Sequence, residues 1–293
     1  MFIKLVGGAA LVLALCDGAF GADFTFAAFG DTPYTRDEEV RFPDFVAEMN
    51  REKLAFVVNI GDIKNAVDAC TDELYAQRRQ WFDLSHHPFI YTPGDNEWTD
   101  CRRALVDKRD PLERMQKLRE VFSSSAVSLG QRPIRLERQS KEFPEHASWE
   151  HEGLVFITLN APGPDNNARM KDEYDRRERA QRDWIAQAFD LAHRRGARAV
   201  VVFMHGDPWN SLGKPRRGYG GLLDALISAT LAFKGEVLLV HGDTHHYRVD
   251  RPLGETVPNF TRVEVFGYPT MNWVRIRVRD SGGRVRFEVT PGS

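Results

Sequence analysis

The sequence has no excess of charge of either sign and very little cysteine. Its 40 Lys and Arg residues nearly balance its 42 Asp and Glu residues, which leaves a formal net charge of −2. Nothing in this balance favours binding to nucleic acid or to a charged membrane surface. Internal repeats and low-complexity linkers are also missing, so we expect one domain. A hydrophobic content of 42% over 293 residues is ordinary for a globular protein and allows a substantial core.

No apolar run is long enough for a comfortable membrane span. The best candidate, Leu5–Leu15, follows the basic residue Lys4 and precedes residues 19–21, a segment with small side chains at both ends. These features predict a signal peptide over residues 1–22. We therefore expect an exported protein, periplasmic or secreted, with no membrane span once the signal is removed. A buried N-terminal strand and a lipid anchor at Cys16 are the alternatives.

The three cysteines become two when the signal is removed, because Cys16 lies within it. Cys70 and Cys101 are then an even pair in an exported protein. An oxidising compartment favours a disulfide between them. Two unpaired buried thiols are the alternative.

Short runs of β-forming residues alternate with stretches of helical periodicity, which is typical of an α/β core. The runs do not alternate between polar and apolar residues, so both faces of these strands are expected to be buried. The longest helical stripe is Trp184–Ala192, and Gly196 is expected to end its helix. The predicted strands are Phe24–Phe29, Ala55–Ile60, Phe89–Thr92, Ala199–Met204 and Val237–Val240.

Two further segments are predicted to be β-hairpins: His146–Leu159, with its turn at Glu152-Gly153, and Val274–Val289. Together with Arg262–Phe266, they are expected to add antiparallel strands beside the α/β unit. The polar stretch Thr99–Phe143 is predicted to be a helical insertion. Its expected apolar face consists of Leu112, Met115, Leu118, Val121 and Phe122.

Four of the predicted strands end in a turn in which glycine precedes aspartate, and two histidines follow strand ends in a similar way. Alone, each of these residues is typical of a turn or a helix cap. In an open α/β sheet, however, ligands collect at the carboxyl ends of the strands. Aspartates gathered there would repel one another unless a cation neutralised them, so the pattern predicts two divalent metal ions with one carboxylate between them. The residues concerned are Gly30-Asp31, Gly61-Asp62, Gly94-Asp95, Gly242-Asp243, His205 and His245.

In their order along the chain, these segments resemble the motifs of the calcineurin-like metallophosphoesterases. That family carries Asp-x-His, Gly-Asp-x-x-Asp/Asn, Gly-Asn-His-Asp/Glu, a single His and Gly-His-x-His. The matching segments are Asp31-Thr32-Pro33, Gly61–Asn65, Gly94–Glu97, His205 and Gly242–His245.

The resemblance covers about Phe24–Tyr247 and implies the family's fold and chemistry. We expect an α/β four-layer sandwich, in which two mixed β-sheets pack together and are flanked by helices. One phosphoesterase domain would then cover residues 23–293, with the helical insertion at about 99–143. The resemblance also implies a dinuclear metal site that hydrolyses esters of small phosphorylated substrates.

The resemblance further implies a ligand set for two metal ions. Asp31 and His245 would hold the first, Asp62 would bridge, and the second would be held by Asp95, His205 and Asp243. In this sequence Pro33 stands where the family has a histidine ligand, and Asp95 and Asp243 replace neutral ligands. Four carboxylates cancel the charge of two divalent cations and only two imidazoles remain. We therefore predict two divalent ions, with Mn, Mg, Ca or ferrous Fe favoured over Zn.

The third motif departs from the family at its catalytic histidine, which Asn96 replaces. An amide can donate a hydrogen bond to a developing oxyanion but cannot transfer a proton near neutral pH. Glu97 is predicted to act as the acid instead, if its pKa is raised; a salt bridge is the alternative. His241 is a second candidate, unless it is a structural residue at a strand end. Asn65 is predicted to reach the bridging oxygen or the substrate, with a helix cap as the alternative.

The positive charge that attracts phosphate is expected from Lys64 or from loop residues that could equally be solvated surface. These loop residues are Arg102, Arg103, Lys214, Arg216 and Arg217. The predicted function is a metal-dependent phosphoesterase, acting on monoesters or diesters. The alternative is a non-catalytic or metal-binding descendant of the fold that binds a partner or ligand, which the residues at Pro33, Asn96 and Asp243 favour.

Overall fold

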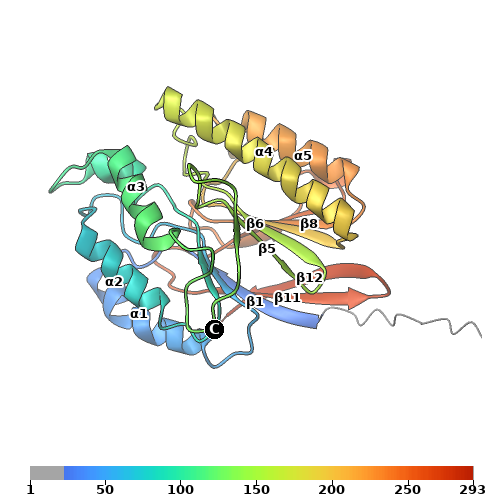
Figure 1. Ribbon diagram of the computed structural model, residues 1–293, viewed down its shortest axis with the longest axis horizontal. Coiled ribbons are helices and arrows are strands. Elements are labelled where there is room, and N and C mark those ends of the chain that lie inside the picture. Colours follow the sequence, from blue (N-terminus) through green and yellow to red (C-terminus); the bar gives the residue numbers. More distant parts are fainter. Residues whose placement is uncertain (1–22, 293) are drawn as a thin grey trace, which may run out of the picture.

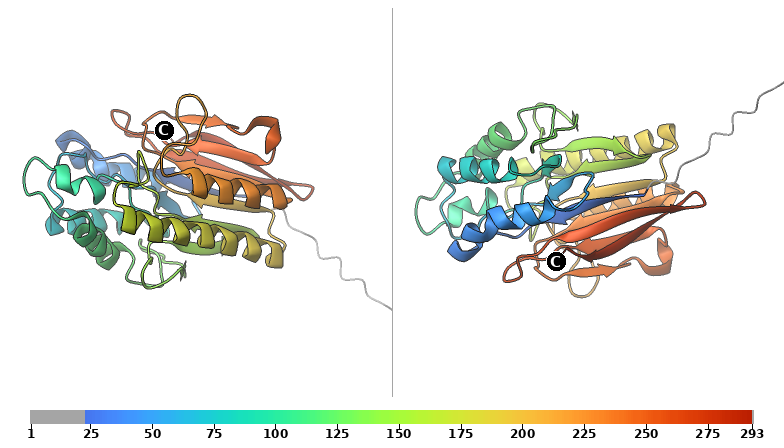
Figure 2. Two further views of the ribbon diagram at one scale, coloured as in Figure 1. Left: turned by 90° about the horizontal axis from the view of Figure 1, so that it is seen from above. Right: turned by 90° about the horizontal axis from the view of Figure 1, so that it is seen from below.

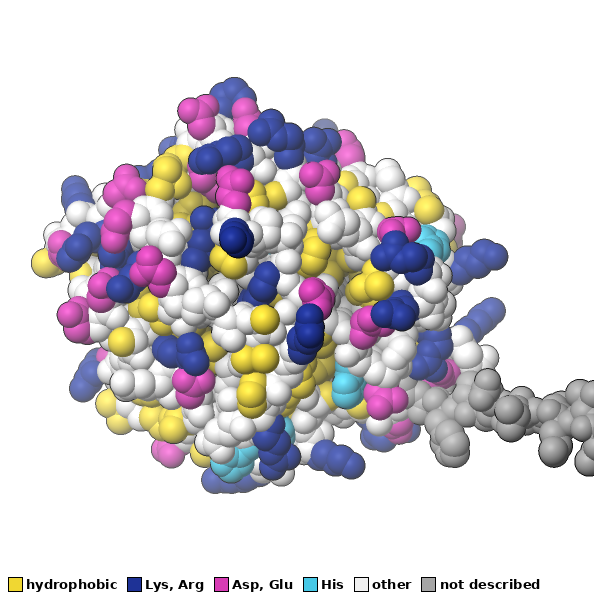
Figure 3. Space-filling model, in the orientation of Figure 1, with side chains coloured by type: hydrophobic (Ala, Val, Ile, Leu, Met, Phe, Trp, Pro, Cys, Tyr) yellow, Lys and Arg dark blue, Asp and Glu magenta, His cyan; other side chains and the backbone are white. Residues whose placement is uncertain are grey.

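The computed structural model describes residues 23–292, so the predicted signal peptide lies outside the described residues. Two mixed β-sheets pack face to face, with helices on both outer faces (Figure 1). Among the described residues, no helix is both long enough and apolar enough to cross a membrane. On the face seen in Figure 3, basic and acidic side chains are interspersed, in keeping with the near-zero net charge.

The first sheet has five strands in the order β12-β11-β1-β2-β3. Strands β1, β2 and β3 are parallel, and β11 pairs antiparallel with β1 on one side and with β12 on the other. The strands are β1 Asp23–Phe29, β2 Val57–Asn59, β3 Phe89–Tyr91, β11 Val274–Ser281 and β12 Arg284–Pro291.

The second sheet has seven strands in the order β4-β5-β6-β7-β8-β10-β9. Its central strands β6, β7, β8 and β10 are parallel, while the flanking strands β4, β5 and β9 are antiparallel to their neighbours. The strands are β4 Glu137–Arg138, β5 Ala147–His151, β6 Leu154–Thr158, β7 Ala199–Phe203, β8 Glu236–His241, β9 Arg248–Asp250 and β10 Phe260–Glu264.

Three buried clusters make four layers out of these elements. One lies between the two sheets, one between the first sheet and helices α1, α2 and α3, and one between the second sheet and helices α4 and α5 (Figure 2). The predicted α/β four-layer fold is therefore confirmed. The helices are α1 Arg36–Met49, α2 Asp72–Phe82, α3 Pro111–Phe122, α4 Lys171–Arg195 and α5 Gly220–Ala232, and two 3-10 turns, η1 and η2, cover Thr99–Arg103 and Gly254–Thr256.

Local sequence explains where the helices begin and end. The side chain of Thr35 accepts a hydrogen bond from the backbone N–H of Glu38 and caps α1, whose first turn is acidic, as the helix dipole favours. Helix α4 ends at Gly196, which adopts a left-handed conformation with φ 62°, as predicted. These caps fix where the loop after β1 ends and where the loop before β7 begins.

Three details differ from the sequence-based expectations. Strand β10 covers Phe260–Glu264 and pairs antiparallel with β9 but parallel with β8, so Arg262–Phe266 is an antiparallel strand only on its β9 side. The hairpin of β5 and β6 is part of the second sheet, because β6 continues into the parallel pairing with β7. Within Thr99–Phe143, helical structure is confined to η1 and α3, and Leu112 on α3 is 41% exposed because that helix buries a narrower face than expected.

Candidate metal centre

The predicted metal ligands all lie just beyond the carboxyl ends of parallel strands of the two sheets. The loops that carry them are joined by backbone hydrogen bonds within each sheet, from Asp31 N to Gly61 O at 3.1 Å and from Gly242 N to His205 O at 2.8 Å. Across the sheets, Asp243 N–H donates to the Asp31 carboxylate at 3.2 Å. The ligands are Asp31 after β1, Asp62 after β2, Asp95 after β3, His205 after β7, and Asp243 and His245 after β8.

Four of these six residues adopt a backbone conformation that is rare for residues with a Cβ. Their φ angles are 54° at Asp31 and Asp62, 77° at Asp243 and 61° at His245. Such left-handed residues persist where the surrounding structure enforces them, and they concentrate at functional sites.

The glycines of the Gly-Asp turns are explained by the close approach of neighbouring loops. A Cβ at Gly94 would lie 2.2 Å from Asp62 Oδ1, and a Cβ at Gly242 would lie 2.2 Å from Asp31 Oδ2. Any side chain at these positions would therefore displace a ligand carboxylate.

His205 lies at the centre of the cluster. Its Nδ1 is 2.9 Å from the carbonyl oxygen of Ile60, and its Nε2 lies 3.1 Å from Asp95 Oδ1 and 3.3 Å from Asp62 Oδ1. An imidazole that donates Nδ1–H to a backbone carbonyl directs the lone pair of Nε2 at its other neighbours, as metal-binding histidines do.

His245 repeats this arrangement at the other side of the cluster. Its Nδ1 is 2.9 Å from the carbonyl oxygen of Tyr268, and its Nε2 is 3.4 Å from Asp31 Oδ1. Both predicted histidine ligands are therefore oriented with Nε2 toward carboxylates.

Two groups of ligand atoms are close enough to share a cation. In each group the atoms lie within 4.8 Å of one another. Two buried atoms in these groups, His205 Nε2 and Asp95 Oδ1, have no hydrogen-bond partner among the described residues. Unpartnered nitrogen and oxygen atoms facing one another in a buried site suit a metal ion. The groups are Asp31, Asp62 and His205, and Asp95, His205 and Asp243.

The electrostatics of the cluster also suit a cation. Burial raises the pKa of Asp62 well above its usual value, and burial together with the neighbouring Asp95 carboxylate raises that of Asp243 to about 7. Burial alone would lower the pKa of His205, but the carboxylates around it raise that pKa well above the usual range. Carboxylates packed this closely are unfavourable when ionised, and bound cations would relieve that cost.

Asp62 is the best-supported carboxylate of the cluster. Its Oδ1 accepts hydrogen bonds from the backbone N–H groups of Asp95 and Asn96, both at 3.0 Å, and its Oδ2 accepts from the hydroxyl of Tyr34 at 2.6 Å. These three bonds fix the orientation of the carboxylate beside His205.

Tyr34 is a site residue whose role the sequence analysis missed. Its hydroxyl contacts Asp62 and also accepts from Asn96 Nδ2 at 3.0 Å, and its ring lies 5.3 Å from that of His245. The available signal was its place immediately after Pro33, beside the missing family histidine.

Glu97, the predicted proton donor, is enclosed by the loops of the site, and its Oε2 has no hydrogen-bond partner among the described residues. Its side chain is fully buried, and its Oε1 accepts from Gly94 N at 2.7 Å, Tyr91 Oη at 2.8 Å and Asp62 N at 3.2 Å. Burial raises its pKa, yet the carboxylate lies beneath the loops and joins them. Among the described residues it makes no salt bridge either, which was the alternative.

The side chains of the predicted substrate-binding residues make no hydrogen bond to the metal-ligand side chains among residues 23–292. Lys64 is fully buried and donates to Asn65 O at 2.8 Å. The Asn65 side chain caps its own loop, accepting from Val67 N and Asp68 N. His241 is fully buried, with Nδ1 2.9 Å from Gly242 O. Its Nε2 has no hydrogen-bond partner among the described residues, and Asn65 Nδ2 donates to the carbonyl oxygen of Tyr34 at 3.0 Å. The substrate-binding roles of Lys64, Asn65 and His241 stay predictions.

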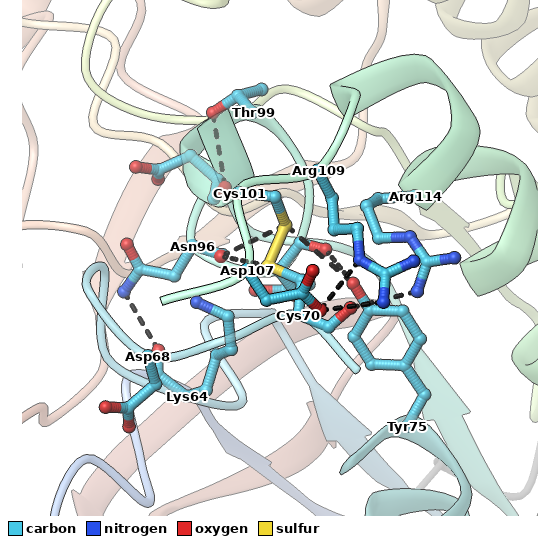
Figure 4. The surroundings of a disulfide bond; sticks show 12 residues. Lys64, Asp68, Cys70, Tyr75, Asn96, Thr99, Cys101, Asp107, Arg109 and Arg114 are labelled. Atoms are coloured by element: carbon cyan, nitrogen blue, oxygen red, sulfur yellow. Dashed lines mark hydrogen bonds and ion pairs between the residues drawn. A yellow bond between two sulfur atoms is a disulfide. The ribbon is translucent and has the colours of Figure 1, made fainter. Parts of the chain in front are cut away.

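The predicted disulfide between Cys70 and Cys101 is confirmed, with 5.7 Å between the two Cα atoms. Both sulfur atoms face the carbonyl oxygen of Asn96, at 3.7 and 3.9 Å, and Tyr75 Oη donates to the carbonyl oxygen of Glu97 at 2.6 Å. Figure 4 shows the bridge next to Asn96. The disulfide therefore supports the third motif from below.

Comparisons with known proteins give a likeness of structure without a likeness of sequence. No protein-family model matches the sequence, and no curated protein is significantly similar to it. Among solved structures, the purple acid phosphatase PPD1 from yellow lupin (Lupinus luteus) seeds matches 93% of this chain with a TM-score of 0.52 and 11% identity. The chain has the calcineurin-like metallophosphoesterase fold.

A second solved structure is similar over most of its length. It is GAP50, described as the anchor in the inner membrane complex of Plasmodium, which matches 92% of this chain and 88% of its own, with a TM-score of 0.50 and 12% identity. The purple acid phosphatase is longer, and the match covers 54% of it. At these identities the likeness shows the metallophosphoesterase fold alone.

Proposed function

We propose that this protein is a metal-dependent hydrolase of phosphate esters, acting on monoesters or diesters at a carboxylate-rich dinuclear centre. The observation that carries the proposal is the convergence of unpartnered ligand atoms around His205 Nε2 at the carboxyl ends of both sheets. Four carboxylates packed together in this way would destabilise the fold in the absence of a cation, and hydrophobic side chains would stabilise it better.

We propose that the ligand atoms serve two metal sites. Asp31 and His245 would hold the first ion, Asp62 would lie between the two, and the second would be held by Asp95, His205 and Asp243. Bound divalent ions would supply Lewis acidity toward phosphoryl oxygens and an activated water as nucleophile. Because oxygen ligands outnumber imidazoles by four to two, we propose Mn, Mg, Ca or ferrous Fe in preference to Zn.

The residues around the ligands orient them. Tyr34 and Asn96 hold Asp62 from two sides; the Tyr34 hydroxyl donates to Asp62, and the Asn96 amide donates to Tyr34 Oη and Lys64 O. A neutral phenol and an amide do not protonate a leaving group readily at neutral pH. We therefore propose a preference for leaving groups that depart without protonation.

The alternative is a non-catalytic or metal-binding member of the fold that binds a partner or ligand. Two observations favour it: Glu97 is placed as a structural carboxylate, and one similar structure is described as an anchor. A protein of this alternative kind would not hydrolyse phosphate esters.

Hydrolysis of 4-nitrophenyl phosphate and bis(4-nitrophenyl) phosphate over Mn, Mg, Ca, Fe and Zn tests the proposal. We expect turnover with at least one of the first four metals, about two ions per chain by elemental analysis, and loss of both in Asp62→Asn. Asp44→Asn, an exposed aspartate on α1, is the matched control. Absence of turnover with every metal, together with absence of bound metal, would establish the alternative.

We also propose that the protein is exported, to a periplasm or out of the cell. The Cys70–Cys101 disulfide supports this, because such bridges persist in oxidising compartments. Fractionation of the cells that make the protein, with N-terminal sequencing of the mature form, checks it: an intact residue 1 in a cytosolic fraction would contradict the proposal.

A further inference from the structure

A pocket lined by arginines lies directly beside the candidate metal centre. Its volume is about 550 Å³. The loops that supply metal ligands also supply its walls: the loop after β7 carries His205 and then Asp207, and the loop after β8 carries Thr244 and His246 on either side of His245. We call it the arginine pocket; the lining residues that matter here are Asp207, Trp209, Arg216, His246, Arg248 and Arg262.

Asp207 connects this pocket to a predicted metal ligand. Its backbone N–H donates to Asp243 Oδ2 at 3.3 Å, and its buried carboxylate receives three guanidinium groups. The nearest nitrogen–oxygen distances are 2.9 Å for Arg248, 3.5 Å for Arg262 and 3.7 Å for Arg216. The three guanidinium groups are therefore separated from the predicted ligand Asp243 by a single residue, Asp207.

The guanidinium groups are held in place without being saturated. Arg248 also pairs with the buried Glu264, and Arg262 with Asp250, so three cations face three carboxylates and the pocket has no net charge from them. Arg248 Nε is buried without a hydrogen-bond partner among the described residues.

Arg216 is the least engaged of the three arginines. Its Nε donates to Trp209 O at 2.7 Å, and its terminal nitrogen reaches Asp207 only at 3.7 Å. Its remaining terminal N–H groups make no hydrogen bond within residues 23–292. Guanidinium groups fixed by carboxylates, with outer N–H groups unpaired, form a preorganised receptor for a phosphate or carboxylate group.

We propose that the arginine pocket binds a second anionic group of the phosphoester substrate while the scissile phosphate lies at the metal centre. The inference rests on the proposed function and narrows it to phosphoesters that carry a further phosphate or carboxylate. The charge balance at the centre supports it: four aspartates cancel two divalent ions, so attraction for a polyanionic substrate has to come from neighbouring donors. Of the basic loop residues considered from sequence, Arg216 is the one that lines this pocket, whereas Lys214 and Arg217 are exposed.

The test is the binding of two phosphonates that cannot be hydrolysed, measured by isothermal titration calorimetry with the metal-loaded protein. Propane-1,3-diphosphonate carries two anionic groups and propylphosphonate carries one. We expect the diphosphonate to bind at least about tenfold more tightly, a ratio that corresponds to roughly one charge-assisted hydrogen bond. Arg216→Met should remove most of this preference, and Arg217→Met, the same change at the exposed neighbour, should retain it.

Several results would overturn the inference. Equal binding of the two phosphonates, or equal losses in Arg216→Met and Arg217→Met, would show that the pocket does not hold the second group. Two orthophosphate ions bound per chain, the second lost in Arg216→Met with no change in diphosphonate preference, would show a site for a free anion instead. Thermal unfolding of both variants verifies that they fold. The preference for the diphosphonate does not depend on turnover. A protein that hydrolyses no phosphoester but still prefers the diphosphonate would therefore refute the proposed function without refuting anion binding in the arginine pocket.

Discussion

Replacing Cys70 and Cys101 together by alanine is expected to lower the free energy of unfolding by about 3.7 kcal/mol. The bridge closes a loop with a sequence separation of 31 residues, and the chain-entropy relation for a loop of that length gives this value at 25 °C. Because both sulfur atoms contact the carbonyl oxygen of Asn96, the change also loosens the loop that donates two backbone hydrogen bonds to Asp62. A fall in metal affinity should accompany the loss of stability.

Urea denaturation of the wild type, the double variant and the reduced wild type measures the first effect, and competition with a chromogenic chelator measures the second. The reduced wild type is the matched control, since it loses the same constraint and keeps both side chains. We expect similar urea midpoints for the double variant and the reduced protein, both well below that of the oxidised wild type. A loss below about 1 kcal/mol with an unchanged denaturant slope would refute the loop-closure argument, and unchanged metal affinity would refute the coupling to Asp62.

Three further changes test individual side chains. Tyr34→Phe removes the hydroxyl that contacts Asp62 and is expected to weaken metal binding about tenfold, as loss of a supporting hydrogen bond does in other metal sites; chelator competition that shows unchanged affinity would contradict this. Glu97→Gln keeps an oxygen that can accept from Gly94 and Asp62, so turnover should fall only a few-fold, whereas a proton donor at this position would lose about a hundredfold or more; kcat measured across pH decides. Burial lowers the pKa of His146 to about 4, and the unfolded value is about 6.5. Its contribution to stability is therefore complete above pH 6.5 and is lost as pH falls to 4. The wild type should lose up to about 3 kcal/mol relative to His146→Phe over that range, and parallel denaturation curves for the two proteins would refute it.

The four-layer fold could be predicted from the resemblance to the calcineurin-like metallophosphoesterases, because the motifs that carry the resemblance are local. The Gly-Asp turns follow short buried strands, and the glycines are required wherever one loop passes within contact distance of the next ligand, as Gly94 does at Asp62. These features are written into adjacent residues. The direction of β10 could not be predicted from adjacent residues. The chain reverses direction in β9 before it enters β10, so β10 is antiparallel to β9 and parallel to β8.

The candidate site was harder to predict where a role depends on partners distant in sequence. Glu97 accepts a hydrogen bond from the backbone of a residue 35 positions earlier, and Tyr34 donates to a carboxylate 28 positions later. Neither distance is visible as spacing within a motif. From sequence, a glutamate next to a catalytic position is typically interpreted as a general acid. The hydrogen bonds that Glu97 accepts from the backbone of Asp62 and Gly94, which join two loops, are visible only in the structure.

The left-handed backbone at Asp31, Asp62, Asp243 and His245 has a consequence for how the protein tolerates change. Each such position carries a conformational cost of about 1 kcal/mol or more that glycine would not incur, and the aspartates add mutual repulsion. Substitutions such as Asp243→Gly should therefore stabilise the chain in a chelator and destabilise it, relative to wild type, when metal is abundant. Melting temperatures of the pair with EDTA and with Mn²⁺ should rank in opposite orders. Laboratory selection for thermal stability in metal-poor medium should then replace the metal ligands first. At these positions, the stability of the metal-free protein is gained at the cost of metal binding and activity.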